Sequence, residues 1–223
     1  MALFMSIQST YHAVEMALYH ERTYLDSVSL EKTIASKSLI SSLEHLLERN
    51  NKKYEDLSFF AVNQGPGPFT TLRVVIATAN GLSFASGIAL FGINALQALI
   101  EEYPLQNPEH TPLALLNAFG NDIYFAYPTH AGELVYGYAP LDAFLAELTA
   151  QTSKKWYFMG NGAALYAEKI VHCLQDRAIF ANPLAHTCSI NTIAQMGYAQ
   201  WQKKSPATHH LSPLYIKKPF IAV

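Results

Sequence analysis

Cysteine is almost missing from this chain of 223 residues, and charged side chains are few. The two cysteines, Cys173 and Cys188, cannot build a disulfide framework and lack the close spacing of a zinc site. Charged residues make up only 14% of the chain, with 15 Lys and Arg against 17 Asp and Glu. A protein that binds nucleic acid by itself needs a basic surface to neutralise phosphates, so autonomous nucleic-acid binding is not expected. A reduced, cytoplasmic setting fits this composition.

The sequence also lacks any apolar run of the roughly 18–20 residues that cross a bilayer. The longest candidate, residues 82–99, is interrupted by serines, glycines, Asn94 and Gln97. We therefore expect no membrane-spanning segment. Hydrophobic residues nevertheless make up 50% of the chain and aromatic residues 12%. Either a large aromatic core or an exposed apolar surface that a partner covers accounts for this excess.

Hydrophobic periodicity predicts the same order of elements in both halves of the chain, β-β-β-α-β-α-β-α. The first half has strands at residues 2–8, 12–19, 23–30, 57–64 and 88–93 and helices at 36–49, 70–85 and 95–103; the second has strands at 113–117, 122–127, 133–138, 156–159 and 178–180 and helices at 140–150, 163–174 and 190–202. Hairpins followed by β-α-β crossovers build a mixed sheet covered by helices. The prediction is an α/β protein with a duplicated ribonuclease-H-like fold, divided into subdomains 1–104 and 105–223.

A glycine-proline loop lies between the strand at 57–64 and the helix at 70–85. It reads Gly65-Pro66-Gly67-Pro68 and is followed by Phe69-Thr70-Thr71-Leu72-Arg73. Two glycines around a proline favour a defined bend, and Thr70 or Thr71 is a candidate cap for the helix that follows. No Lys-Ser/Thr pair follows the glycines, so the loop is not a Walker-type phosphate cradle.

The longer segment around this loop resembles the signature of the TsaB (YeaZ) family. Residues 63–99 read NQGPGPFTTLRVVIATANGLSFASGIALFGINALQAL. The family form is GPGSFTGLR, then an AKGL-type helix, then a strand of the IPLVGVSSL kind. Weaker similarity runs over the whole chain and includes the closing residues 213–217, PLYIK. The resemblance implies the duplicated fold of actin, Hsp70 and sugar kinases.

The resemblance implies a non-catalytic subunit without a cofactor. In this family the chain binds and stabilises TsaD, with the ATPase TsaE, during threonylcarbamoyladenosine modification of the adenosine next to the anticodon of tRNAs that read codons beginning with A. It would meet tRNA only through that complex. Pairing in the family uses the first two helices, and the same surface is expected to form a homodimer when the chain is alone. The partner-binding residues expected on this basis are Leu39, Leu43, Leu46, Phe69, Thr70, Arg73, Ala77 and Asn80, and the motif loop is Gly65, Pro66, Gly67 and Pro68.

This chain departs from the family pattern at several positions. Ile7 stands where nucleotide-using members of the fold, and many relatives, have an aspartate. Pro68 and Thr71 replace a serine and a glycine, and Asn117 and Phe119 replace an aspartate and an arginine. The loss of the carboxylate argues against ATP chemistry. Whether this divergent member still supports the modification stays open at the level of the sequence.

Two other functions remain as alternatives. One is a free-standing ATP-dependent small-molecule kinase or ATPase of the same fold. The other is a glycoprotease-like metallopeptidase, which needs histidines four residues apart on a helix. None of the nine histidines is paired in that way, and His209-His210 are expected in an exposed polar loop. We therefore predict no metal site.

Overall fold

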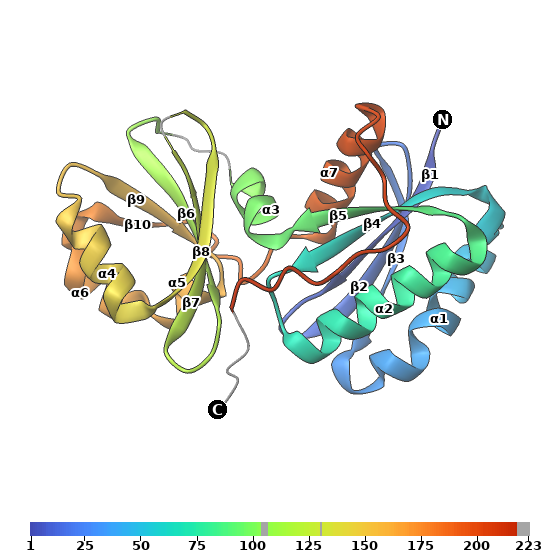
Figure 1. Cartoon of the computed structure of the whole chain (residues 1–223), viewed down its shortest axis with the longest axis horizontal. Coiled ribbons are helices and arrows are strands. Elements are labelled where there is room, and N and C mark those ends of the chain that lie inside the picture. The colour runs from blue at the N-terminus through green and yellow to red at the C-terminus, as the bar shows by residue number, and fades with distance from the viewer. Residues whose placement is uncertain (104–106, 130, 218–223) are drawn as a thin grey trace. The chain divides into compact units, whose positions relative to one another are not determined.

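The computed structural model describes residues 1–103, 107–129 and 131–217. The chain divides into two compact units, each built on a five-stranded mixed sheet (Figure 1). Unit 1 comprises Met1–Ala95 and Ser189–Leu214, and unit 2 comprises Leu96–Cys188 and the chain from Tyr215. The predicted α/β duplication is therefore confirmed.

Unit 1 has the strand order β3-β2-β1-β4-β5. Its elements are β1 (Leu3–Ser9), β2 (Ala13–His20), β3 (Thr23–Glu31), α1 (Lys32–Arg49), a 3-10 turn η1 (Tyr54–Asp56), β4 (Leu57–Gly65), α2 (Phe69–Ser86), β5 (Ala89–Asn94) and α7 (Ile190–Gln202). β1, β2 and β3 pair antiparallel, whereas β4 pairs parallel with both β1 and β5. Tight turns join the antiparallel strands, and the helices α1 and α2 supply the longer connections that parallel pairing requires.

Unit 2 repeats this topology with the order β10-β9-β6-β7-β8. Its elements are α3 (Ala95–Glu102), β6 (His110–Asn117), β7 (Asp122–Pro128), β8 (Leu134–Pro140), α4 (Leu141–Ala150), β9 (Lys155–Met159), α5 (Asn161–Leu165), α6 (Ala167–Leu174), η2 (Gln175–Arg177) and β10 (Ala178–Phe180). The predicted helix at 163–174 is thus two helices, α5 and α6. The core of unit 2 lies between its sheet and the inner faces of α4 and α6. Trp156 and Phe144 are among the largest buried side chains of this core.

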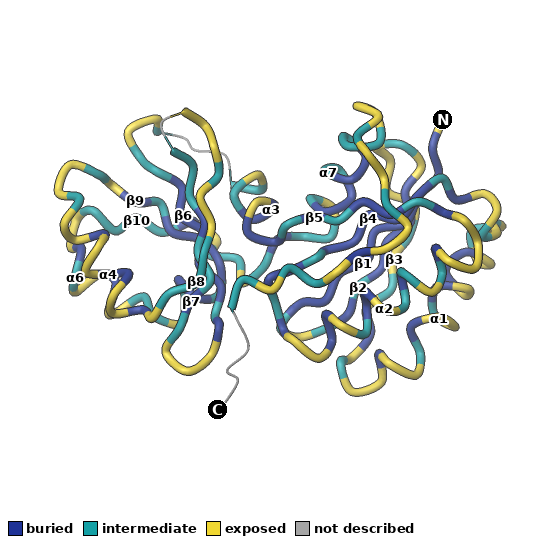
Figure 2. Tube along the Cα trace, in the orientation of Figure 1, coloured by how far each residue is buried: buried dark blue, intermediate teal, exposed yellow. Residues whose placement is uncertain are grey.

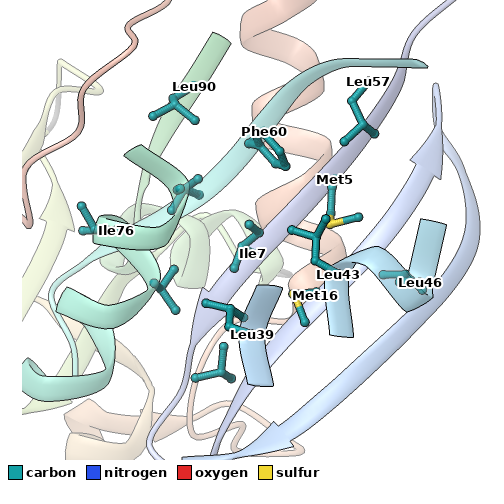
Figure 3. Close-up of a cluster of buried hydrophobic side chains, with 14 of the residues drawn as sticks. Met5, Ile7, Met16, Leu39, Leu43, Leu46, Leu57, Phe60, Ile76 and Leu90 are labelled. Carbon is teal, nitrogen blue, oxygen red and sulfur yellow. The ribbon is translucent and has the colours of Figure 1, made fainter. Parts of the chain in front are cut away.

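The central strand β1 of unit 1 is buried on both faces, and its alternating side chains separate two layers. Met5 and Ile7 face the apolar cluster beneath α1 and α2 (Figure 3). Phe4 points to the opposite layer, where its ring stacks on Phe59 at 4.4 Å and on Tyr198 of α7 at 5.7 Å. The sheet of unit 1 is therefore covered by α1 and α2 on one face and by α7 on the other.

The position of α7 differs from the predicted division of the chain. We predicted subdomains 1–104 and 105–223; that boundary lies outside the described residues, and the last helix packs in unit 1. Gly197 lets α7 pack closely on β4, because a Cβ at this position would lie 2.4 Å from the Cβ of Ala61 in β4. An apolar helix face does not encode which of two similar sheets it covers, so the sequence pattern could not assign α7.

Candidate functional site

The glycine-proline loop is a short turn between β4 and α2. Gly65 has φ +95°, and a Cβ there would lie 2.8 Å from Cδ2 of Leu72. Only glycine fits this position without strain. The helix begins at Phe69 with Pro68 as its N-cap residue, and no side chain caps it. The expectation that Thr70 or Thr71 caps α2 is therefore wrong.

Thr71 instead joins the start of α2 to the end of β1. Its hydroxyl accepts a buried hydrogen bond of 2.6 Å from the Ser9 hydroxyl. The next residue, Thr10, closes the β1–β2 turn, because its hydroxyl accepts from the backbone N–H of Ala13 at 2.9 Å and donates to the Ala13 carbonyl at 3.1 Å. Both hydroxyls at this turn are thus engaged within the protein, next to the buried Ile7.

The leucines expected to bind a partner from α1 belong to the core. Leu39, Leu43 and Leu46 have exposed fractions of 1%, 0% and 0% and point toward the sheet in Figure 3. They cannot reach a partner in this fold, so this part of the site prediction is wrong. Ile40, the residue after Leu39 on α1, is 51% exposed. The outer face of α1 also presents Ile34, at 45% exposure.

On α2, by contrast, most of the expected residues lie at the surface. Phe69, Thr70, Arg73 and Ala77 are all exposed (Figure 2). The Arg73 guanidinium lies over the Phe69 ring, with Cζ 3.6 Å from the ring centroid. Gly81 and Phe84 continue this side of the helix at steps of three to four residues, and Phe84 is 91% exposed. We call Phe69, Arg73, Ala77, Gly81 and Phe84 the α2 stripe.

Asn80 has a structural role. Its side-chain amide donates to the carbonyl of Leu211 at 2.9 Å, and its carbonyl oxygen accepts from the backbone N–H of Leu211 at 2.8 Å. This pair holds the segment after α7 against α2. The prediction of Asn80 as a partner contact is not supported, because both ends of its amide are bonded inside unit 1.

A groove of about 740 Å³ opens between α1 and α2. It is lined by Ile40, Glu44, Tyr54, Glu55, Leu57, Ser58, Leu82, Ala85, Ser86, Gly87 and Ile88. The hydroxyl of Tyr54 is buried there and has no hydrogen-bond partner among the residues that the structure describes. Sequence reasoning missed this groove, because its residues come from three separate stretches, 40–44, 54–58 and 82–88, and no motif joins them.

In unit 2, the turn after β6 uses polar side chains at the positions that depart from the family. The Asn117 side chain accepts from the backbone N–H of Phe119 at 2.8 Å, and the Asn161 side chain accepts from the backbone N–H of Asn117 at 3.0 Å. Phe119 has φ +59° and is 60% exposed. Gly160, which precedes Asn161, has a positive φ of +96°.

A second polar cluster of unit 2 joins the end of the described chain to β7. Lys217 Nζ donates to Asp122 at 2.9 Å, and the Tyr138 hydroxyl donates to the same carboxylate oxygen at 2.5 Å. The hydrogen bond from Tyr138, followed by the interactions with Lys217, lowers the pKa of Asp122, and the hydrogen bond to Asp122 raises the pKa of Lys217.

The histidine prediction is confirmed, because His209 and His210 are both exposed and lie outside helices and strands. His209 also contacts α2, where its Nδ1 lies 3.1 Å from the Ser83 hydroxyl. The Ser83 hydroxyl donates its one hydrogen to the carbonyl of Ile88 at 2.6 Å, so His209 Nδ1 is the donor in the hydrogen bond between His209 and Ser83. This bond holds the segment around His209 against α2. Within the described ranges there is no group of three or more His, Cys, Asp or Glu side chains placed to hold a metal ion. No helix in these ranges is long and apolar enough to cross a membrane.

Comparison with known proteins supplies the family. The model of a family described as TsaD, tRNA N6-adenosine threonylcarbamoyltransferase, matches residues 34–219. The chain belongs to this family, on its TsaB (YeaZ) branch. It is 22% identical over 163 residues to the tRNA threonylcarbamoyladenosine biosynthesis protein TsaB of Escherichia coli, covering 71% of each chain.

Solved YeaZ structures agree with the fold. A Pseudomonas aeruginosa protein described as similar to peptidase YeaZ matches with a TM-score of 0.74 and 18% identity, over 97% of this chain and 100% of that one. YeaZ from the same organism matches with a TM-score of 0.69 and 20% identity, over 96% and 100% of the two chains. The duplicated fold expected from the sequence resemblance is thus confirmed. The relatives named TsaB support involvement of this chain in threonylcarbamoyladenosine biosynthesis.

Proposed function

We propose that this chain is the non-catalytic companion of a TsaD homologue, which it binds and stabilises, with TsaE, during threonylcarbamoyladenosine modification of tRNA. The family membership supports the pathway, and the composition supports contact with tRNA only through the complex. The engaged hydroxyls of Ser9 and Thr10 and the apolar side chain of Ile7 favour this function over a free-standing kinase, whose first turn handles a nucleotide.

The single observation that carries the proposal is the α2 stripe. It combines two exposed phenylalanines with a guanidinium that lies over one of their rings and with two small residues between them. Exposed aromatic and arginine side chains are typical anchors of protein interfaces, and small residues let a second helix approach closely. The proposed partner-binding surface is therefore the outer face of α2 together with Ile34 and Ile40 of α1.

Copurification with the TsaD homologue encoded in the same genome tests the proposal. We expect a stable complex with the wild-type chain. Arg73→Glu and Ala77→Arg should each weaken it by about tenfold or more, because they place a repulsive charge or a bulky side chain in the middle of the stripe. Alone, the wild-type chain should form a homodimer in light scattering, and both variants should shift it toward monomer.

Arg22→Glu is the matched control, because Arg22 is an exposed residue of the β2–β3 turn, outside this surface. Arg22→Glu makes the same change of charge as Arg73→Glu. It should leave both the complex with the TsaD homologue and the homodimer intact. Lack of any complex with the wild-type chain would remove the companion role. Micromolar binding of Mg-ATP by the isolated chain, measured by calorimetry, would favour the kinase instead.

A further inference from the structure

The groove between α1 and α2 has an apolar floor and an acidic rim. Ile40, Leu57, Leu82, Ala85 and Ile88 supply the apolar side chains. Its charged lining residues, among those that the structure describes, are Glu44 from α1 and Glu55 from the 3-10 turn η1, and both are exposed. A surface with this lining is complementary to a positively charged side chain that also has a long aliphatic stem.

Tyr54 adds a directional polar group to the groove. Burial raises the pKa of its phenol to about 12, and the negative charge of Glu44 adds to this shift. The hydroxyl therefore stays protonated at neutral pH, and its oxygen is buried without a hydrogen bond from the described residues. Buried polar atoms without a hydrogen-bond partner are rare and costly in folded proteins. A bound N–H donor would remove this cost.

We propose that the groove receives an arginine side chain of the partner protein. The guanidinium has several donors in one plane, enough to reach the Glu44 and Glu55 carboxylates and the Tyr54 oxygen, while its stem lies against the apolar floor. A lysine offers a single compact charge and matches three acceptors less well. This inference rests on the proposed association with a TsaD homologue and names the chemistry of one contact within it.

The partner is favoured as the source of the arginine because the groove continues the proposed interface. Leu82 and Ala85 of the groove lie on α2 directly beside Gly81 and Phe84 of the α2 stripe. A helix docked along the stripe would therefore place its own side chains at the mouth of the groove. Together, the stripe and the groove form one surface with apolar anchors and one acidic recess.

Calorimetric titration of the wild-type chain and its variants with the TsaD homologue from the same genome tests the inference. We expect the double variant Glu44→Lys/Glu55→Lys to raise Kd by about 100-fold, because two repulsive charges replace two attractive ones. Tyr54→Phe removes only the oxygen and should raise Kd by about tenfold. The control, Glu147→Lys/Glu168→Lys, makes the same net charge change on exposed positions of unit 2 and should change Kd by less than about threefold.

The outcomes separate this inference from the proposed function. If the wild-type chain binds and the groove and control variants weaken binding equally, the arginine contact is refuted while the companion role stands. If the groove variants impair only the homodimer, the occupant belongs to a second copy and the inference is also refuted. Lack of wild-type binding overturns both. Restored binding of the double variant to a partner carrying one Arg→Glu change identifies the arginine; circular dichroism and thermal unfolding check that each variant is folded.

Discussion

At the scale of single residues, the backbone at Gly160 lies in close contact with a neighbouring strand. Gly160 follows β9 with φ +96° and ψ 167°, a backbone region that only glycine populates readily. A Cβ there would lie 2.3 Å from the carbonyl oxygen of Leu115 and 2.8 Å from Leu99. The sequence has two glycines here, Gly160 and Gly162, but does not show how closely each one approaches β6.

Gly160→Ala should therefore be strongly destabilising. Backbone strain and overpacking each cost about 1–3 kcal/mol, so we expect a loss of about 3 kcal/mol in the free energy of unfolding, measured by urea denaturation. Gly120→Ala is the matched control, since Gly120 also has a positive φ, +68°, but a Cβ there would meet nothing within 4 Å. The control should lose only about 1 kcal/mol. Equal losses would show that steric contact at Gly160 is unimportant.

At the scale of elements, periodicity predicts where helices and strands lie better than it predicts what each face contacts. The leucine spacing of α1 correctly predicts an amphipathic helix, and the glycine-proline loop correctly marks the start of α2. The resemblance placed Leu39, Leu43 and Leu46 at the partner surface, yet the sheet of unit 1 already covers them. A pattern of apolar side chains indicates that one helix face is buried. It does not indicate whether the same chain or a partner protein covers that face. The groove at Tyr54 could not be predicted, because it exists only once three separate stretches of the chain are assembled.

The two faces of α1 should respond differently to truncation. Leu43→Ala removes a fully buried side chain and should lower the free energy of unfolding by about 2–5 kcal/mol. Ile34→Ala, at a position that is 45% exposed, should lower it by less than about 1 kcal/mol but weaken the complex with the TsaD homologue. Chemical denaturation and calorimetry measure the two effects separately. If Leu43→Ala weakened binding without destabilising the fold, Leu43 would belong to the interface after all.

At the scale of the whole molecule, the order of elements along the chain does not coincide with the division into units. The chain passes between the units after Ala95, after Cys188 and after Leu214. α7 is the last helix in the sequence, but it covers the aromatic layer of β1 and β4, where the Trp201 ring stacks on the Phe59 ring with 5.9 Å between the centroids. Unit 1 therefore cannot complete its core until the second half of the chain is present, and unit 2 behaves as an insertion between β5 and α7.

This connectivity predicts that the first half of the chain does not fold alone. A fragment of residues 1–104 leaves Phe4 and Phe59 without the helix that buries them, so it should aggregate and bind hydrophobic dyes. Residues 1–95 joined to 189–214 by a flexible Gly/Ser linker of about 20 residues should instead give a dispersed NMR spectrum and cooperative unfolding. Replacing Tyr198 and Trp201 by serine in the linked protein is the control and should restore aggregation. Cooperative folding of the 1–104 fragment would show that α7 is dispensable for the core of unit 1 and that the simpler division of the chain into halves is correct.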